Sequence, residues 1–152
     1  MERRITEEQV TKQLLDWLET NNWEIVSFDF PQSGTGVLIH PNDTSSKNGA
    51  SFLPDIVAIK NGVVVFFENK DRFVRSDFFK VNNLKNTNDY SNDINKLLNT
   101  YSYTSIYYGV GMPYTDRNLQ KTVENFELVD FAVLMKNAQN FEIIGNYKKI
   151  FE

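Results

Sequence analysis

The strongest constraint on the fold of this 152-residue chain is an Asn-Gly pair between two apolar runs. The runs are Phe52–Lys60 and Val63–Lys70, and Asn61-Gly62 separates them. This arrangement is typical of a two-residue type I′ turn, and it predicts an antiparallel hairpin. A two-residue loop also sets the register of the two strands, and in that register Asp55 lies directly opposite Glu68.

Alternation along the predicted strands sorts their side chains onto two faces of the sheet. One face carries the ionisable residues Asp55, Glu68 and Lys70 and, toward the turn, the apolar residues Val57, Ile59, Val64 and Phe66. The other face carries Ile56, Ala58, Val65 and Phe67. Because both faces are apolar toward the turn, we expect the hairpin to lie inside the sheet and to be covered on both sides.

The predicted positions of Asp55 and Glu68 raise an electrostatic problem. Side chains directly opposed on neighbouring strands have Cβ atoms about 5 Å apart, and like charges at that distance repel. Apolar neighbours such as Val57 and Phe66 reduce solvation and increase the repulsion. Lys70 supplies one compensating charge, and a divalent cation would supply more. Carboxylate and water oxygens are the ligands that Mg²⁺ prefers, so the pattern predicts a magnesium site.

An acid pair and a lysine around a hard metal ion are typical of a hydrolytic site. A bound metal ion polarises a phosphoryl oxygen and lowers the pKa of a coordinated water molecule. Lys70 would orient or deprotonate that water, or neutralise the charge that develops in the transition state. Phosphodiesters are the natural substrates, because their anionic oxygens complete the ligand shell of the metal.

The composition excludes several other kinds of site. The chain has no Cys and a single His, His40, so disulfides, thiolate zinc sites and multi-histidine metal sites are excluded. The net charge of −4 argues against nucleic-acid binding by bulk charge alone, although it permits a local basic stripe. The longest apolar run, Val63–Phe67, is too short to span a membrane, and the N-terminal residues lack the apolar region of a signal peptide. We therefore expect a cytoplasmic protein without a membrane partner.

The remaining hydrophobic pattern predicts an α/β fold, a mixed β-sheet flanked by helices, in one domain that spans residues 1–152. Helices are expected at Thr6–Asn21, Ser76–Leu84, Asp89–Tyr101 and Tyr114–Glu124. Besides the hairpin, strands are expected at Trp23–Phe30, Tyr103–Val110, Leu128–Met135 and Phe141–Gly145. Residues 31–51 are expected to form a long polar loop, and loops of that length are often functional.

Two parts of the chain resemble known nucleases. Leu53-Pro54-Asp55, followed after a hairpin by Glu68-Asn69-Lys70, resembles the signature of the PD-(D/E)xK nuclease superfamily. The segments FPQSGTG and LPDIVAIKNGVVVFFENKDR resemble the core of archaeal Holliday-junction resolvases, and many small type II restriction endonucleases share that core. The resemblance covers roughly residues 7–72 and implies a restriction-endonuclease-like fold with an αβββαβ core.

The resemblance also implies a role for each residue of the signature. Asp55 and Glu68 would be ligands of Mg²⁺, for which Mn²⁺ would substitute, and the backbone carbonyl of Asn69 would be a third ligand. Lys70 would be the catalytic lysine.

Two further residues come from the segments before the hairpin. Families of this kind often add a carboxylate from the first helix, and Glu7 and Glu8 are the candidates. Glu7 falls within the stripe of Val10 and Leu14, whereas Glu8 points about 100° away, so the helical wheel favours Glu7. The alternative for Glu7 is a first-turn acid that only stabilises the helix dipole. Ser33 aligns with a serine-bearing loop that serves catalysis in the resolvases, and the alternative is an ordinary turn residue.

Basic residues in excess follow the signature, namely Arg72, Arg75, Lys80 and Lys85. They predict a track for a nucleic-acid backbone, and the alternative is a solvated helix face. We therefore expect a Mg²⁺-dependent DNA endonuclease of the type II restriction class. A Holliday-junction resolvase and a non-catalytic DNA-binding subunit with the same fold are the alternatives. Cleavage of both DNA strands by so small a chain usually needs two active sites, which predicts a homodimer or a partner subunit.

Overall fold

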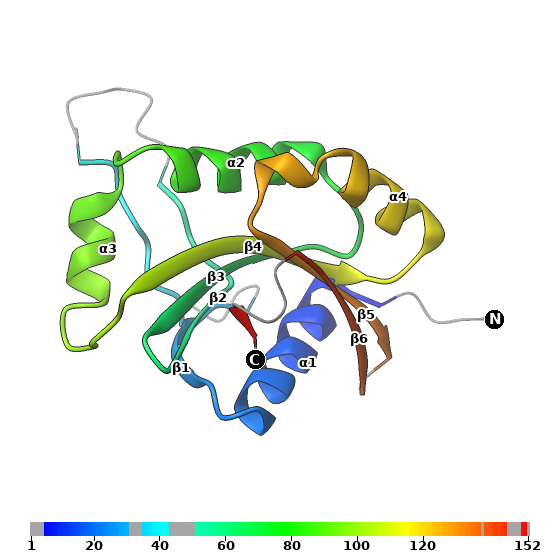
Figure 1. The fold of residues 1–152 in the computed structure, drawn as a ribbon, viewed down its shortest axis with the longest axis horizontal. Coiled ribbons are helices and arrows are strands. Elements are labelled where there is room, and N and C mark those ends of the chain that lie inside the picture. Colours follow the sequence, from blue (N-terminus) through cyan, green and yellow to red (C-terminus); the bar gives the residue numbers. More distant parts are fainter. Residues whose placement is uncertain (1–4, 31–34, 43–50, 138, 146–149, 152) are drawn as a thin grey trace.

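The computed structural model describes residues 5–30, 35–42, 51–137, 139–145 and 150–151, and these residues form a six-stranded mixed β-sheet flanked by helices (Figure 1). The predicted α/β class is therefore confirmed. The strands are β1 (Glu24–Phe28), β2 (Ile56–Lys60), β3 (Val63–Asn69), β4 (Ser105–Pro113), β5 (Phe131–Asn137) and β6 (Asn140–Gly145). The helices are α1 (Glu7–Thr20), α2 (Arg75–Asn86), α3 (Ser91–Leu97) and α4 (Asp116–Glu124), with a short 3₁₀ helix, η1 (Phe126–Leu128), after α4.

The strands follow one another across the sheet in the order in which they occur in the chain. β1–β2, β2–β3 and β5–β6 are antiparallel pairs, whereas β3–β4 and β4–β5 are parallel. The carboxyl ends of β3, β4 and β5 therefore meet at one edge of the sheet, which is where ligands bind in open α/β sheets. Within the described residues, none of the helices has the length and apolar character needed to cross a lipid bilayer.

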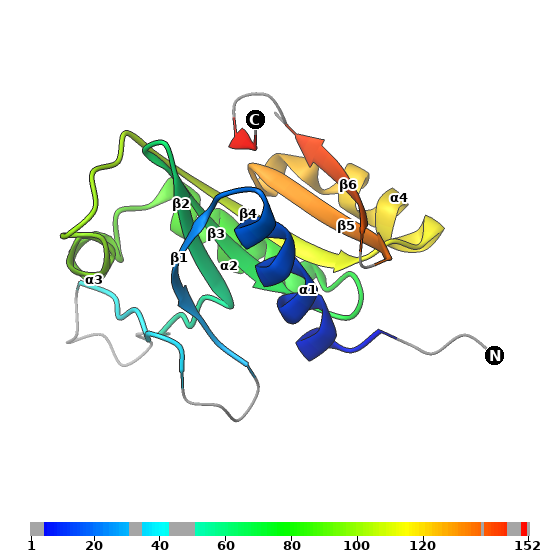
Figure 2. The ribbon, with the colours of Figure 1, turned by 90° about the horizontal axis from the view of Figure 1, so that it is seen from below.

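The helices cover both faces of the sheet (Figures 1 and 2). α1 lies on one face, where Val10, Leu14 and Leu18 are fully buried. Thr6 caps this helix, as the predicted start indicates, and forms a capping box with Gln9. α2, α3 and α4 lie on the opposite face, so the sheet separates two apolar cores.

The β2–β3 hairpin has the predicted turn and register. Asn61 and Gly62 both adopt positive φ angles, 51° and 80°, as a type I′ turn requires. The ladder runs from the turn to the pair formed by Ile56 and Phe67. Its two faces pack into different cores, as alternation predicts, so the hairpin is covered on both sides.

Several element boundaries differ from the predicted ones. β2 is shorter than predicted, because Phe52 forms a separate bridge with Ile39. α4 begins later, because the N–H of Tyr114 donates to the carbonyl oxygen of Met135 (2.8 Å) and the side chain of Thr115 caps the helix. β5 also begins later, because η1 precedes it, and α3 is shorter than the predicted helix at both ends.

Candidate active site

Asp55 lies at the open end of the β2–β3 hairpin, one residue before β2. Its N–H donates to the carbonyl oxygen of Phe67 (3.0 Å), and its Oδ2 accepts a hydrogen bond from the N–H of Asn69 (2.7 Å). Because a carboxylate rather than a backbone carbonyl takes this β3 donor, the ladder ends one pair short of the predicted Asp55–Glu68 pair. The two acids still lie at the same end of neighbouring strands, and the charge of Asp55 acts on Glu68.

Both carboxyl groups have raised pKa values. Burial raises the pKa of Asp55 to about 7; the hydrogen bond from Asn69 opposes the shift, and the charge of Glu7 adds to it. Burial also raises the pKa of Glu68 to about 8, and the charges of Asp55 and Asp77 act in the same direction. Neutral pH is therefore close to both pKa values, and a cation bound between these groups would stabilise their charged forms.

Lys70 extends the site beyond the end of β3. Its backbone N–H donates to the carbonyl oxygen of Gly111 on β4 (3.0 Å), and its Nζ lies 3.7 Å from Oε1 of Glu7. Partial burial acts to lower the pKa of Lys70, but the charges of the surrounding acids, first Asp77 and then Glu7, outweigh it and raise the pKa. Lys70 is therefore an ammonium ion at neutral pH, and it fits charge neutralisation better than deprotonation of water.

The side chain of Asn69 anchors α1 beside the site. Asn69 is fully buried, and its Nδ2 donates to Oγ1 of Thr11 on α1 (3.1 Å). At Gly111, a Cβ atom would lie 2.5 Å from Cδ1 of Leu14, so the glycine lets α1 approach β4 closely. These contacts bring Glu7 to the site, as the helical wheel predicts. The nuclease signature implies a role only for the backbone carbonyl of Asn69, because the anchoring role of its side chain depends on a contact with the distant residue Thr11.

Asp77 is an acid near the site that does not belong to the nuclease signature. It lies in the first turn of α2, and its charge acts on both Glu68 and Lys70. It precedes the buried residue Val81 by four positions and therefore lies on the apolar stripe of α2. That spacing is the sequence signal that would have marked Asp77 as a buried acid.

The four basic residues predicted to follow a nucleic-acid backbone have different surroundings. All four contact other side chains: Lys80 contacts Asp77, Lys85 contacts Asp130, and Arg75 contacts Phe79 and Asn125. Arg72 donates to Asp71 (2.9 Å) at the rim of a large cleft. The remaining predicted site residue, Ser33, lies outside the described residues.

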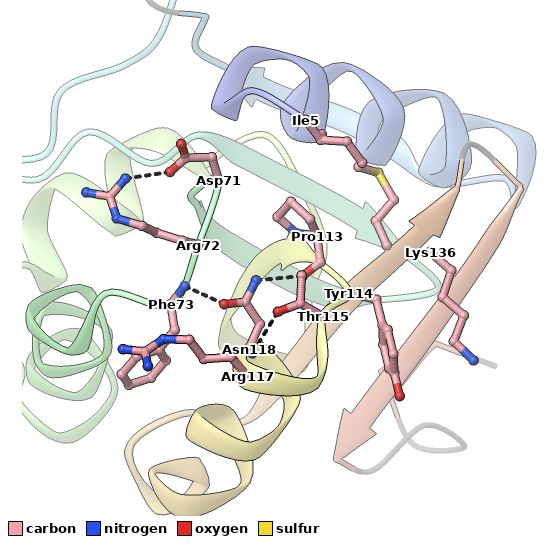
Figure 3. Close-up of a pocket in the computed structure, with 11 residues that line it drawn as sticks. Ile5, Asp71, Arg72, Phe73, Pro113, Tyr114, Thr115, Arg117, Asn118 and Lys136 are labelled. Atoms are coloured by element: carbon pink, nitrogen blue, oxygen red, sulfur yellow. Dashed lines mark hydrogen bonds and ion pairs between the residues drawn. The ribbon is translucent and has the colours of Figure 1, made fainter. Parts of the chain in front are cut away.

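This cleft, of about 810 Å³, lies at the carboxyl edge of the parallel strands, where the chain leaves β3 (Figure 3). Basic residues from three parts of the chain line it, namely Arg72, Arg117 and Lys136. Asn118 joins two of its walls, because its Oδ1 accepts from the N–H of Phe73 (3.0 Å) and its Nδ2 donates to the carbonyl oxygen of Pro113 (2.9 Å). Arg117 and Lys136 were not among the predicted basic residues, because they lie far from the signature along the chain and only the fold brings them to this edge.

A comparison of the chain with protein-family models, curated proteins and solved structures finds no match. The candidate site is therefore described from the chemistry of its residues alone. Within the part of the chain that the structure describes, no three His, Asp or Glu side chains gather closely enough to form a complete metal site. The available donors are the desolvated carboxyl groups of Asp55 and Glu68, and such oxygen donors fit a hard divalent cation such as Mg²⁺.

Proposed function

We propose that this chain is a metal-dependent DNA endonuclease of the restriction type, with a restriction-endonuclease-like fold. The proposal rests on one observation: the carboxyl groups of the half-buried Asp55 and the buried Glu68, whose pKa values are raised, lie with the Lys70 ammonium at the open end of one hairpin. Desolvated acids with perturbed pKa values next to a charged partner are typical of functional sites. Acid pairs with a lysine are typical of metal-assisted phosphodiester hydrolysis.

In this proposal, Asp55, Glu68 and the backbone carbonyl of Asn69 hold Mg²⁺ or Mn²⁺. A metal ion bound there supplies an acidified water molecule and polarises the phosphoryl oxygen. Lys70 neutralises the negative charge that develops on the phosphate, because its raised pKa keeps it protonated. Glu7 positions the Lys70 side chain through their ion pair of 3.7 Å, and its further role as a metal ligand stays a prediction.

The DNA strand would lie in the cleft at the carboxyl edge of the sheet. Arg72 and Arg117 line this cleft from different parts of the chain, and guanidinium groups suit phosphate oxygens. The net charge of −4 favours a restriction enzyme, which reads bases through a few directed contacts, over a resolvase that needs a broad basic surface. Cleavage of both strands would require a homodimer or a partner subunit, and the cytoplasm is the location at which DNA is available.

The proposal is tested with the pure chain, Mg²⁺ or Mn²⁺, linear duplex DNA of mixed sequence and a synthetic four-way junction. We expect metal-dependent cleavage that Asp55→Asn lowers by at least about 10³-fold, because each tenfold loss of rate is about 1.4 kcal/mol and a metal ligand contributes several kcal/mol. The fold should remain intact, because the substitution removes a repulsive charge. The matched control is Asp16→Asn, which changes an exposed acid in the middle of α1 and should keep the full rate.

The products separate the alternatives. Ordered double-strand cuts at one short sequence indicate a restriction enzyme, whereas symmetric nicking of the four-way junction indicates a resolvase. Complete inertness of the wild-type protein with bound DNA indicates a non-catalytic subunit and contradicts the proposal. A full cleavage rate in Asp55→Asn, or a large fall in its Tm, would contradict the proposed role of the acid pair.

A further inference from the structure

The carboxylate of Asp77 is buried and only partly neutralised. Its side chain is 6% exposed, and its Oδ1 lies 3.7 Å from Nζ of Lys80. Its Oδ2 is fully buried and has no hydrogen-bond partner among the described residues. A buried anionic oxygen without a donor destabilises the folded state unless another group compensates its charge.

Asp77 faces the same cavity as Glu68. Glu68 follows Phe66 by two positions on β3, so its side chain lies on the face of the sheet that α2 covers. Both acids line a small cavity of about 10 Å³ between β3, β4 and α2, which is also lined by Lys70 and Met112. A space of this size is about the smallest that holds one water molecule, and a dehydrated metal ion needs no more.

The cations nearest this cavity are directed at other atoms. Nζ of Lys70 lies 3.7 Å from Oε1 of Glu7, and Nζ of Lys80 lies 3.7 Å from Oδ1 of Asp77 rather than from its Oδ2. The guanidinium of Arg72 also lines the cavity, but it is hydrogen-bonded to Asp71. A divalent cation in the cavity would give Oδ2 of Asp77 and the carboxyl group of Glu68 a shared positive partner.

We propose that Asp77 is a metal-ligating residue, and that it holds a divalent cation together with Glu68 in the cavity between β3 and α2. The inference rests on the proposed function, because Glu68 belongs to the same site. It assigns a ligand to α2, whereas the sequence predicted the additional acid on α1. Glu7 on α1 is 36% exposed and contacts Lys70, while Asp77 comes from the helix that covers the face on which Glu68 lies.

The test measures Mn²⁺ binding by isothermal titration calorimetry in the wild-type chain, Asp77→Asn, Asp55→Asn and the control Asp16→Asn. We expect Asp77→Asn to weaken Mn²⁺ binding by at least about tenfold or to remove one ion per chain. Asp16→Asn should bind as the wild type does. Unchanged affinity and stoichiometry in Asp77→Asn, with weaker binding in Asp55→Asn, would overturn this inference and leave the proposed function intact. Absence of Mn²⁺ binding in the wild-type chain would overturn both.

A crystal of the wild-type chain soaked in Mn²⁺ gives a second test that needs no variant. The expected result is an anomalous peak at about 2.1 Å from a carboxylate oxygen of Asp77, the distance typical of small hard divalent cations. An ion that is held by Asp55 and Glu68 while Asp77 lies outside its ligand shell would overturn the inference. This measurement remains decisive even if Asp77→Asn does not fold.

Discussion

Each end of α2 lies next to an acid, Asp77 in its own first turn and Asp130 directly before β5, but only the acid at the C-terminal end has partners for both oxygens. At the C-terminal end, Nζ of Lys85 lies 3.1 Å from Oδ1 of Asp130, and the N–H of Tyr108 donates to Oδ2 of Asp130 (2.9 Å). At the N-terminal end, Oδ2 of Asp77 has no hydrogen-bond partner among the described residues, and Glu68 lines the same cavity. Both oxygens of Asp130 therefore have partners, whereas one oxygen of Asp77 has none among the described residues.

This contrast separates an acid that serves only the fold from acids that fit a ligand. Each oxygen of Asp130 has its own cationic or N–H partner, so no further group is needed there. A buried charge that lacks partners lowers the stability of the native state, and a structural role alone does not explain it. We therefore interpret the N-terminal end of α2 as the functional end and the C-terminal end as structural.

The largest expected effect is on the rate of DNA cleavage. Lys70→Ala should lower kcat by about 10²–10⁴-fold, because it removes the positive charge that stabilises the transition state. Mn²⁺ affinity should be kept or increased, because a competing positive charge disappears from the site. Lys85→Ala, at the other end of α2, is the control and should keep its rate. A full rate in Lys70→Ala would remove Lys70 from the proposed chemistry.

The next effect is on the pH dependence of stability without divalent cations. The folded-state pKa values of Asp55 and Glu68, about 7 and about 8, exceed their unfolded values of about 4. Between these values the folded chain retains protons that the unfolded chain has released. The free energy of unfolding should therefore fall as the pH rises from about 4 to about 8.

Thermal unfolding in EDTA at pH 5.5 and pH 8.5 measures this dependence. We expect Tm to be lower at pH 8.5 by about 5 °C, which corresponds to roughly 2 kcal/mol for a chain of this size. Addition of Mg²⁺ at pH 8.5 should raise Tm, because the cation binds the folded state and replaces the lost protons. Asp55→Asn should show a smaller pH dependence. A Tm in EDTA that is higher at pH 8.5 than at pH 5.5 would contradict the raised pKa values.

The smallest expected effects distinguish a basic residue that stabilises the fold, Lys85, from one that binds DNA, Arg117. Lys85→Ala should lower the free energy of unfolding by about 1 kcal/mol and leave DNA affinity unchanged, because Lys85 is paired with Asp130 and is only 28% exposed. Arg117→Ala, in the cleft, should leave stability unchanged and reduce the slope of log K against log salt concentration by about one. Urea unfolding and DNA titrations at several salt concentrations measure both. Equal losses of DNA affinity in the two variants would contradict the distinction.

The sequence predicted those parts of the fold that depend on neighbours along the chain. The start of the first helix at Thr6 and the Asn61-Gly62 turn are confirmed, because both depend on contacts within a few residues. The predicted start of β2 is too early, because Phe52 pairs with Ile39 in a separate bridge instead of continuing the strand. The ladder ends at Ile56–Phe67, one pair before the predicted Asp55–Glu68 pair, because the Asp55 carboxylate accepts the hydrogen bond from the N–H of Asn69.

For the candidate site, the sequence by itself determined that two acids and a lysine come to one end of a hairpin. Turn chemistry and strand alternation are sufficient for this, because both act over short distances along the chain. Only the tertiary structure decided that Asp77 lies beside Glu68, that Lys85 neutralises Asp130, and that Arg117 reaches the cleft. These placements depend on how α2 and α4 pack their apolar faces on the sheet, and side-chain packing between distant elements is not encoded in any local pattern.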